Sequence, residues 1–350
     1  MRAINECCPS QPCAGTGARV FAVLLLLLAP AWVNGADTTV ATLTLEELRQ
    51  RHALPSSRYA TVDGMNLHYV DEGSGPVVVL LHASYQGLRS WDPLAARLRE
   101  RFRVVRFDFP NAGLSSDDKP VPEEKFDMMA RYVGALFHLM RELDIDRFAL
   151  LGTSSGGTAA FRYASIYPGQ VQRLVLINSA GMPRTPRTDP LRERPAMARW
   201  EGMKVRPRAF WEFALADNFI APNRAPAWFV DQAFDYARRE GLAAKRADYV
   251  YETGDPKRVL ADIVAPTLIM WGKANPTVMH LEADVMAHWM TAAPTAVRKY
   301  PGLGHYPYVE DLDAIYSDLL AFLTGAMDTA LRRTVRLPAD MGCACGHASD

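Results

Sequence analysis

Residues 149–160 read ALLGTSSGGTAA, an apolar run that ends at a glycine and is followed by two serines and two more glycines. Gly152 to Gly156 match the pattern G-x-S-x-G, here between an expected strand and an expected helix. In that context Ser154 occupies a sharp turn, and Ser155 begins the helix with its N–H directed to where an oxyanion forms. The stretch therefore predicts a nucleophile elbow. The simpler interpretation is a pair of serines that cap a helix.

Strands and helices alternate on both sides of this turn. Apolar runs at 77–82, 102–109 and 171–180 are typical of strands buried on both faces of a parallel sheet, and amphipathic stretches between them predict helices. The alternation stops at 181–262, where helical pieces rich in tryptophan and phenylalanine appear, and it resumes with a strand at 265–272. This pattern predicts an α/β fold, a mostly parallel sheet flanked by helices, with a helical cap inserted over the carboxyl ends of the strands.

The same boundaries divide the chain into five segments. Residues 1–36 contain arginines before a charge-free apolar run, which predicts a signal peptide or, as the alternative, a membrane anchor. We expect the first part of the core at 37–182, the helical cap at 183–262, the second part of the core at 263–325 and a tail at 326–350. The protein is therefore expected to be exported, either periplasmic or secreted, or attached to a membrane through its N-terminal segment.

Charge and cysteine content limit the partners. Lys plus Arg and Asp plus Glu are both 39, so the formal net charge is zero and no nucleic-acid partner is indicated. Downstream of the apolar N-terminal run the only cysteines are Cys343 and Cys345, which with His347 make a weak metal-binding pattern. We interpret them as incidental thiols of a terminal tail. The expected partner is a small-molecule substrate, with no metal and no organic cofactor.

Two segments before the elbow resemble the α/β-hydrolase superfamily, and the resemblance extends over about residues 59–323. LLHASYQGLRSW is similar to the His-Gly oxyanion loop of that family, with Ala83 in place of the usual glycine. By this resemblance the N–H of Ser84 is the second oxyanion donor, beside that of Ser155. FDFPNAGLSSDD is similar to the family segment Asp-x-x-Gly-x-Gly-x-Ser, from which Asn111 departs.

The end of the chain carries the same resemblance. YPGLGHYPYVEDLDAIYSDLLAFL is similar to the last Gly-His segment of the family, which implies that His305 is the base that takes the proton of Ser154. Family members that act on haloalkanes or epoxides carry aspartate at the elbow, so Ser154 favours hydrolysis of an ester, lactone or thioester through an acyl-enzyme. A cofactor-free carbon–carbon hydrolase or a perhydrolase would use the same residues and is an alternative.

The position of the triad acid holds an asparagine. In the family the loop equivalent to WGKANPTV carries an aspartate where this chain has Asn275. Asn275 could orient His305 as a neutral acceptor, or an acid such as Glu282 or Asp284 could replace it, whereas Asn178, at the other common location, is no acid either. A third interpretation is a weak or inactive site in a ligand-binding protein. The first is favoured because nucleophile, base and oxyanion loop are all retained.

Overall fold

The computed structural model describes residues 40–117, 126–183, 199–200, 202–203, 205–216, 218–220, 225–242, 249–250 and 254–332. The expected signal or anchor at 1–36 and the cluster of Cys343, Cys345 and His347 lie outside these residues. Among the described residues, no helix has both the length and the apolar character needed to cross a membrane.

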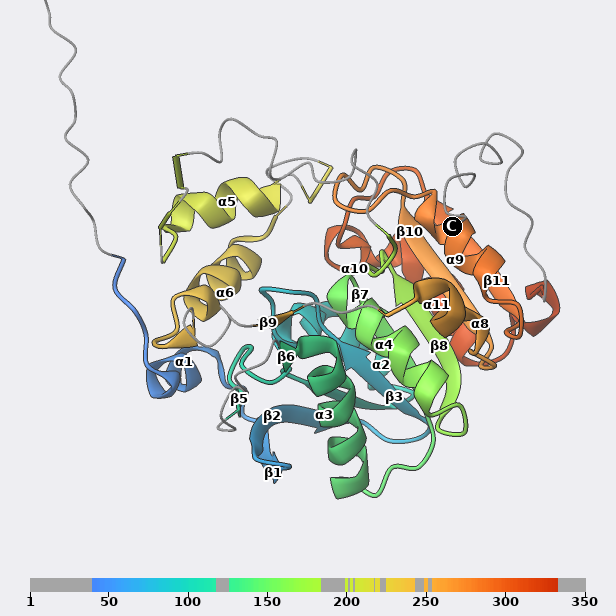
Figure 1. Ribbon diagram of the computed structural model, residues 1–350, viewed down its shortest axis with the longest axis horizontal. Helices are drawn as coiled ribbons and strands as arrows, with labels where there is room; N and C mark the ends of the chain where they lie inside the picture. Colours follow the sequence, from blue (N-terminus) through green and yellow to red (C-terminus); the bar gives the residue numbers. More distant parts are fainter. Residues whose placement is uncertain are drawn as a thin grey trace, which may run out of the picture. The chain divides into compact units, whose positions relative to one another are not determined.

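A nine-stranded sheet forms the body of residues 40–332, with the strand order β1-β2-β4-β3-β7-β8-β10-β11 and β5 paired to β2 (Figure 1). From β4 to β11 every neighbouring pair is parallel, while β2 runs antiparallel to β1, β4 and β5. This confirms the expected α/β fold with a mostly parallel sheet. The strands are β1 (Arg58–Val62), β2 (Met65–Glu72), β3 (Val77–Leu81), β4 (Arg103–Phe107), β5 (Ser116–Asp117), β7 (Phe148–Thr153), β8 (Val171–Ile177), β10 (Thr267–Gly272) and β11 (Thr295–Tyr300).

Helices cover both faces of the sheet, so both the odd-numbered and the even-numbered residues of a central strand are buried. Val79 and Leu81 of β3 belong to the apolar core of one face, and Val78 and Leu80 belong to that of the other. Figure 1 shows α3 and α4, which pack against each other, crossing the strands on the first face. The first face carries α3 (Met128–Glu142), α4 (Ser155–Ile166), α8 (Pro256–Ala261) and α9 (Glu282–Trp289); the second carries the 3-10 helix η1 (Leu88–Trp91), α2 (Asp92–Leu98), α10 (Pro307–Glu310) and α11 (Leu312–Leu323).

Two helices that we call the cap helices, α5 (Arg208–Ala216) and α6 (Ala227–Ala237), lie between β8 and β10 in the sequence and pack against each other. Their buried aromatic residues, among them Trp211 and Phe229, share the second apolar core with Tyr308 of α10. The short helix α1 (Leu45–His52) packs against α6. There His52 Nε2 lies 2.9 Å from Asp235 Oδ2, and both side chains are buried. Helix α1, which precedes the sheet in the sequence, therefore helps to keep α6 in place.

The contacts differ from the expected segment limits in two places. Helix α8 falls inside the limits expected for the cap, yet it packs against α4 and α9 of the body because Leu260 is buried in the first core. Beyond residue 325, where we expected a tail, Met327 is buried and Arg332 pairs antiparallel with Thr295. Contacts with the body therefore continue to Arg332. A short parallel sheet of β6 (Phe126–Asp127) and β9 (Tyr249–Val250) was also not expected.

Candidate active site

Ser154 lies at the turn between β7 and α4 with φ 51° and ψ −121°. A non-glycine residue adopts such a conformation at a cost of about 1–3 kcal/mol, so the surroundings must hold it. Ser154 donates its N–H to the Ile177 carbonyl at 3.2 Å, and its own carbonyl accepts the N–H of Ala180 at 3.0 Å. A Cβ on Gly156 would lie 2.3 Å from the Leu81 carbonyl oxygen, so only glycine lets α4 approach β3 this closely. The sequence GTSSG thus forms a strained strand–turn–helix corner.

His305 lies in the loop between β11 and α10 and is 2% exposed. Its backbone N–H donates to the Asn218 carbonyl at 2.7 Å, and its carbonyl accepts from Asn178 Nδ2 at 2.9 Å. Asn178 also binds the Gly304 carbonyl and the N–H of Gly272, so this asparagine holds the loop through backbone groups. Burial lowers the pKa of His305 to about 3, because the imidazolium would lose its hydration without gaining a counter-charge.

The side chain of Asn275 faces this imidazole, with Oδ1 3.2 Å from His305 Nδ1. The same oxygen accepts the N–H groups of Thr277 at 2.9 Å and Val278 at 3.3 Å. Two N–H donors require an oxygen, so the amide cannot be turned to present its NH₂ group to His305. Nδ1 must then carry the hydrogen, and Nε2 is left as the acceptor that a serine base needs. The amide nitrogen Nδ2 of Asn275 is buried without a hydrogen-bond partner in the described structure.

The two acids considered as replacements for Asn275 have other surroundings. Asp284 is on α9 and forms an ion pair with Lys299 of β11, while Glu282 starts the same helix. Burial is the cause of the lowered pKa of His305, and no carboxylate among the described residues opposes it. The described residues also bring no three His, Cys, Asp or Glu side chains together as metal ligands.

Ser84 and Ser155 meet where the loop after β3 passes the start of α4. Ser84 Oγ donates to Ser155 Oγ at 2.9 Å. Within the described part of the chain, the backbone N–H groups of both serines have no acceptor. Two open N–H groups, one of them directly after Ser154, are what an oxyanion requires. Ser154 Oγ and His305 form no hydrogen bond among the described residues, a contact that often tightens only when substrate binds.

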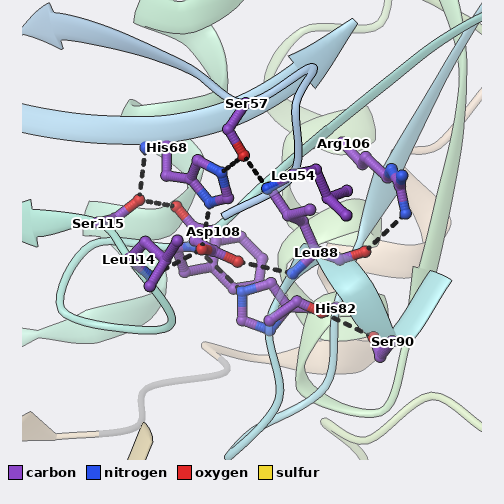
Figure 2. A network of polar contacts seen from close by, with 12 residues as sticks. Leu54, Ser57, His68, His82, Leu88, Ser90, Arg106, Asp108, Leu114 and Ser115 are labelled. Atoms are coloured by element: carbon purple, nitrogen blue, oxygen red, sulfur yellow. Dashed lines mark hydrogen bonds and ion pairs between the residues drawn. The ribbon is translucent and has the colours of Figure 1, made fainter. Parts of the chain in front are cut away.

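Figure 2 shows a buried polar network around Asp108, which reaches the loop after β3 through Leu88. Asp108 accepts hydrogen bonds from the N–H groups of Leu88 at 2.6 Å and Leu114 at 2.8 Å, and from His68 Nδ1 at 2.7 Å. Burial by itself raises the pKa of Asp108, but the attraction of His68 and these donors hold the pKa below its usual value. His68 Nε2 lies 2.7 Å from Ser57 Oγ, which links the loop to the segment after α1.

Sequence reasoning did not identify the residues that orient Asn275 or the polar network around Asp108. Asn275 is followed by Pro276 and Thr277, a composition typical of an Asx turn, and that signal was available. The partnership of His68 with Asp108 had no local signal, since forty residues separate the two side chains.

Comparison with known proteins agrees with this architecture. Residues 76–312 match the sequence profile of a family described as alpha/beta hydrolase fold. Uncharacterized proteins of Mycobacterium tuberculosis and Mycobacterium bovis are 32% identical over 130 residues, and the match spans 37% of this chain and 37% of their length. A cis-3-alkyl-4-alkyloxetan-2-one decarboxylase of Shewanella oneidensis is 26% identical over 310 residues, with 82% of this chain and 93% of that protein covered.

Solved structures give the same result. A membrane phospholipase A described as a bacterial virulence factor superposes with a TM-score of 0.64 and 25% identity, over 78% of this chain and 87% of that one. An enol-lactonase from Burkholderia xenovorans LB400 superposes with a TM-score of 0.62 and 25% identity, over 76% of this chain and all of that one, 100%.

Proposed function

The chain belongs to the alpha/beta hydrolase fold family, and we propose that it is a serine hydrolase that cleaves a small ester, lactone or thioester through an acyl-enzyme. The observation that carries this proposal is the pairing of a strained elbow serine with an imidazole whose Nε2 is kept as an acceptor. Similarity to an enol-lactonase and a phospholipase supports an acyl substrate.

The elbow serine, the oriented imidazole and the two open N–H groups support the following roles. Ser154 Oγ attacks the acyl carbon and passes its proton to His305 Nε2, while the N–H groups of Ser84 and Ser155 bind the oxyanion. The C–O or C–S bond then breaks, and His305 returns the proton to the leaving alcohol or thiol. Water repeats the sequence to release the acid. Throughout, Asn275 Oδ1 accepts the hydrogen of Nδ1 and keeps the ring oriented.

A second candidate function rests on the neutral Asn275. Without a carboxylate, the imidazolium that forms during attack lacks a counter-charge, which favours slow turnover or a ligand-binding role for the same pocket. Export, or membrane attachment through residues 1–36, stays a proposal that rests on the apolar run in the sequence.

Labelling with a fluorophosphonate probe tests the two candidates. We expect the purified protein to be labelled on the peptide that contains Ser154, with labelling lost in Ser154→Ala and retained, more slowly, in Ser155→Ala. Mass spectrometry identifies the modified residue. Absence of labelling at Ser154 in correctly folded protein, together with retained ligand binding, would contradict the serine hydrolase and favour the binding protein.

A further inference from the structure

The hydroxyl groups of Ser84 and Ser155 form a side-chain pair that the mechanism above does not use. Ser84 is exposed, whereas Ser155 is 3% exposed, and the two oxygens are 2.9 Å apart. Ser84 Oγ is the one hydrogen-bond partner of Ser155 Oγ among the described residues, so the buried Ser155 hydroxyl keeps capacity for a further hydrogen bond. A buried hydroxyl that does not use its full hydrogen-bonding capacity is stabilised by an acceptor that a ligand supplies.

Helix capping does not account for this serine. Ser154 holds the N-cap position of α4 and makes no side-chain cap, and Ser155 is the first helical residue. Its hydroxyl bonds across to a loop 71 residues away rather than to its own helix. That loop carries the other open N–H group, so the hydroxyl pair joins the two residues assigned to the oxyanion.

We propose that Ser155 Oγ–H is a third hydrogen-bond donor to the oxyanion and that Ser84 is a positioning residue that orients it. A hydroxyl that accepts one hydrogen bond becomes a better donor, and O–H···O⁻ bonds are among the stronger ones. Asn275 lacks the negative charge with which a triad acid stabilises the transition state. Negative charge on the oxyanion and positive charge on the imidazole develop in the same step, so a third donor to the oxyanion offsets part of that loss. This inference rests on the proposed function and names a further catalytic residue for it.

Steady-state kinetics on a 4-nitrophenyl ester test the role of the pair. We expect Ser155→Ala to lower kcat by about 10- to 100-fold, which is at or below the lower end of the roughly 100- to 1000-fold loss typical of a main oxyanion donor, with KM nearly unchanged. Ser84→Ala should lower kcat less, and the double variant should match Ser155→Ala, because Ser84 acts through Ser155. Ser155→Thr keeps the hydroxyl and should restore most of kcat.

Two further measurements separate catalysis from structure. Affinity for a trifluoromethyl ketone, whose adduct carries the oxyanion, should fall in proportion to kcat/KM in each variant. Ser179→Ala is the matched control, since it removes a buried hydroxyl that bonds a backbone carbonyl, and it should leave kcat within about twofold.

The outcomes distinguish this proposal from the proposed function. If the wild-type chain turns over esters but Ser155→Ala keeps its kcat and its affinity for the ketone, the third donor is wrong and the serine hydrolase stands. Additive losses in the double variant would overturn the positioning role of Ser84. If Ser154 of the wild-type chain neither labels nor turns over, both proposals fail.

Discussion

Replacing Asn275 by aspartate should raise the pKa of His305 and the rate of ester hydrolysis. Burial lowers this pKa from 6.5 to about 3, which disfavours the imidazolium by about 5 kcal/mol at about 1.36 kcal/mol per unit. A carboxylate oxygen 3.2 Å from Nδ1 attracts the imidazolium by about 5 kcal/mol at an effective dielectric constant of about 20. The two effects nearly cancel, so the variant should have a His305 pKa near its ordinary value.

The kinetic gain follows from the same charge. His305 is only partly protonated in the transition state, so we expect kcat/KM of Asn275→Asp at pH 8 to rise about 10- to 1000-fold rather than by the full electrostatic energy. The carboxylate keeps the N–H bonds from Thr277 and Val278 and removes the unpartnered Nδ2, so the fold should tolerate it. Asn275→Ala is the control, and it should lose activity because the ring is no longer oriented.

The pH–rate profile is the decisive assay. For the wild-type chain we expect kcat/KM to stay nearly constant from pH 7 down to about 4, because the base remains unprotonated. For Asn275→Asp it should fall tenfold per unit below about pH 6.5. The reasoning would be refuted if kcat/KM of the wild-type chain already decreased below about pH 6.5 and Asn275→Asp did not shift that decrease. Such a result would mean that His305 is neither buried nor in contact with residue 275.

Three further predictions concern stability. In the folded state His305 binds a proton only near pH 3, whereas in the unfolded chain it does so near pH 6.5. The free energy of unfolding should therefore fall by up to about 5 kcal/mol as the pH decreases from 6.5 to 3. Urea titrations of His305→Gln should lack this pH dependence. Gly156→Ala should destabilise by about 3 kcal/mol and abolish labelling, because its Cβ would lie 2.3 Å from a carbonyl oxygen, whereas Gly134→Ala in open space on α3 should stabilise by about 1 kcal/mol in thermal melts. Asp235→Asn should destabilise by about 3 kcal/mol in urea, because it removes the charge that pairs with His52 of α1 and with Arg238; an unchanged midpoint would mean that these pairs do not stabilise the cap helix.

Local patterns in the sequence were sufficient for the fold and the elbow. Apolar runs separated by amphipathic stretches predict a parallel sheet, because strands covered by helices on both faces are apolar throughout. The two glycines around Ser154 are required by backbone approaches of under 3 Å, so the motif carries its own steric reason. The cap was less predictable, since α8 has the same helical pattern as its neighbours but packs on the body.

The surroundings of His305 and of Asp108 could not be predicted from the sequence, because they depend on long-range contacts. The surroundings of His305 depend on Asn218, which accepts the His305 N–H and the hydroxyl of Thr277 from a segment far along the chain. Spacing gives no information about such contacts, because they form only when the segment after α5 packs beside the last loops of the sheet. The same holds for His68 and Asp108, which come together across two strands.

The orientation of one amide decides whether an asparagine can take the place of the triad acid. In a serine protease, an Asp→Asn change at this position lowers kcat by about 10⁴, largely because the histidine takes the wrong tautomer. Here the N–H groups of Thr277 and Val278 hold the amide oxygen toward Nδ1, so that part of the loss should not arise. What remains is the missing negative charge of the acid. Its absence is costly here because His305 is buried, so the imidazolium has neither hydration nor a counter-charge. An enzyme built this way gives up rate at neutral pH and keeps its base unprotonated in acid.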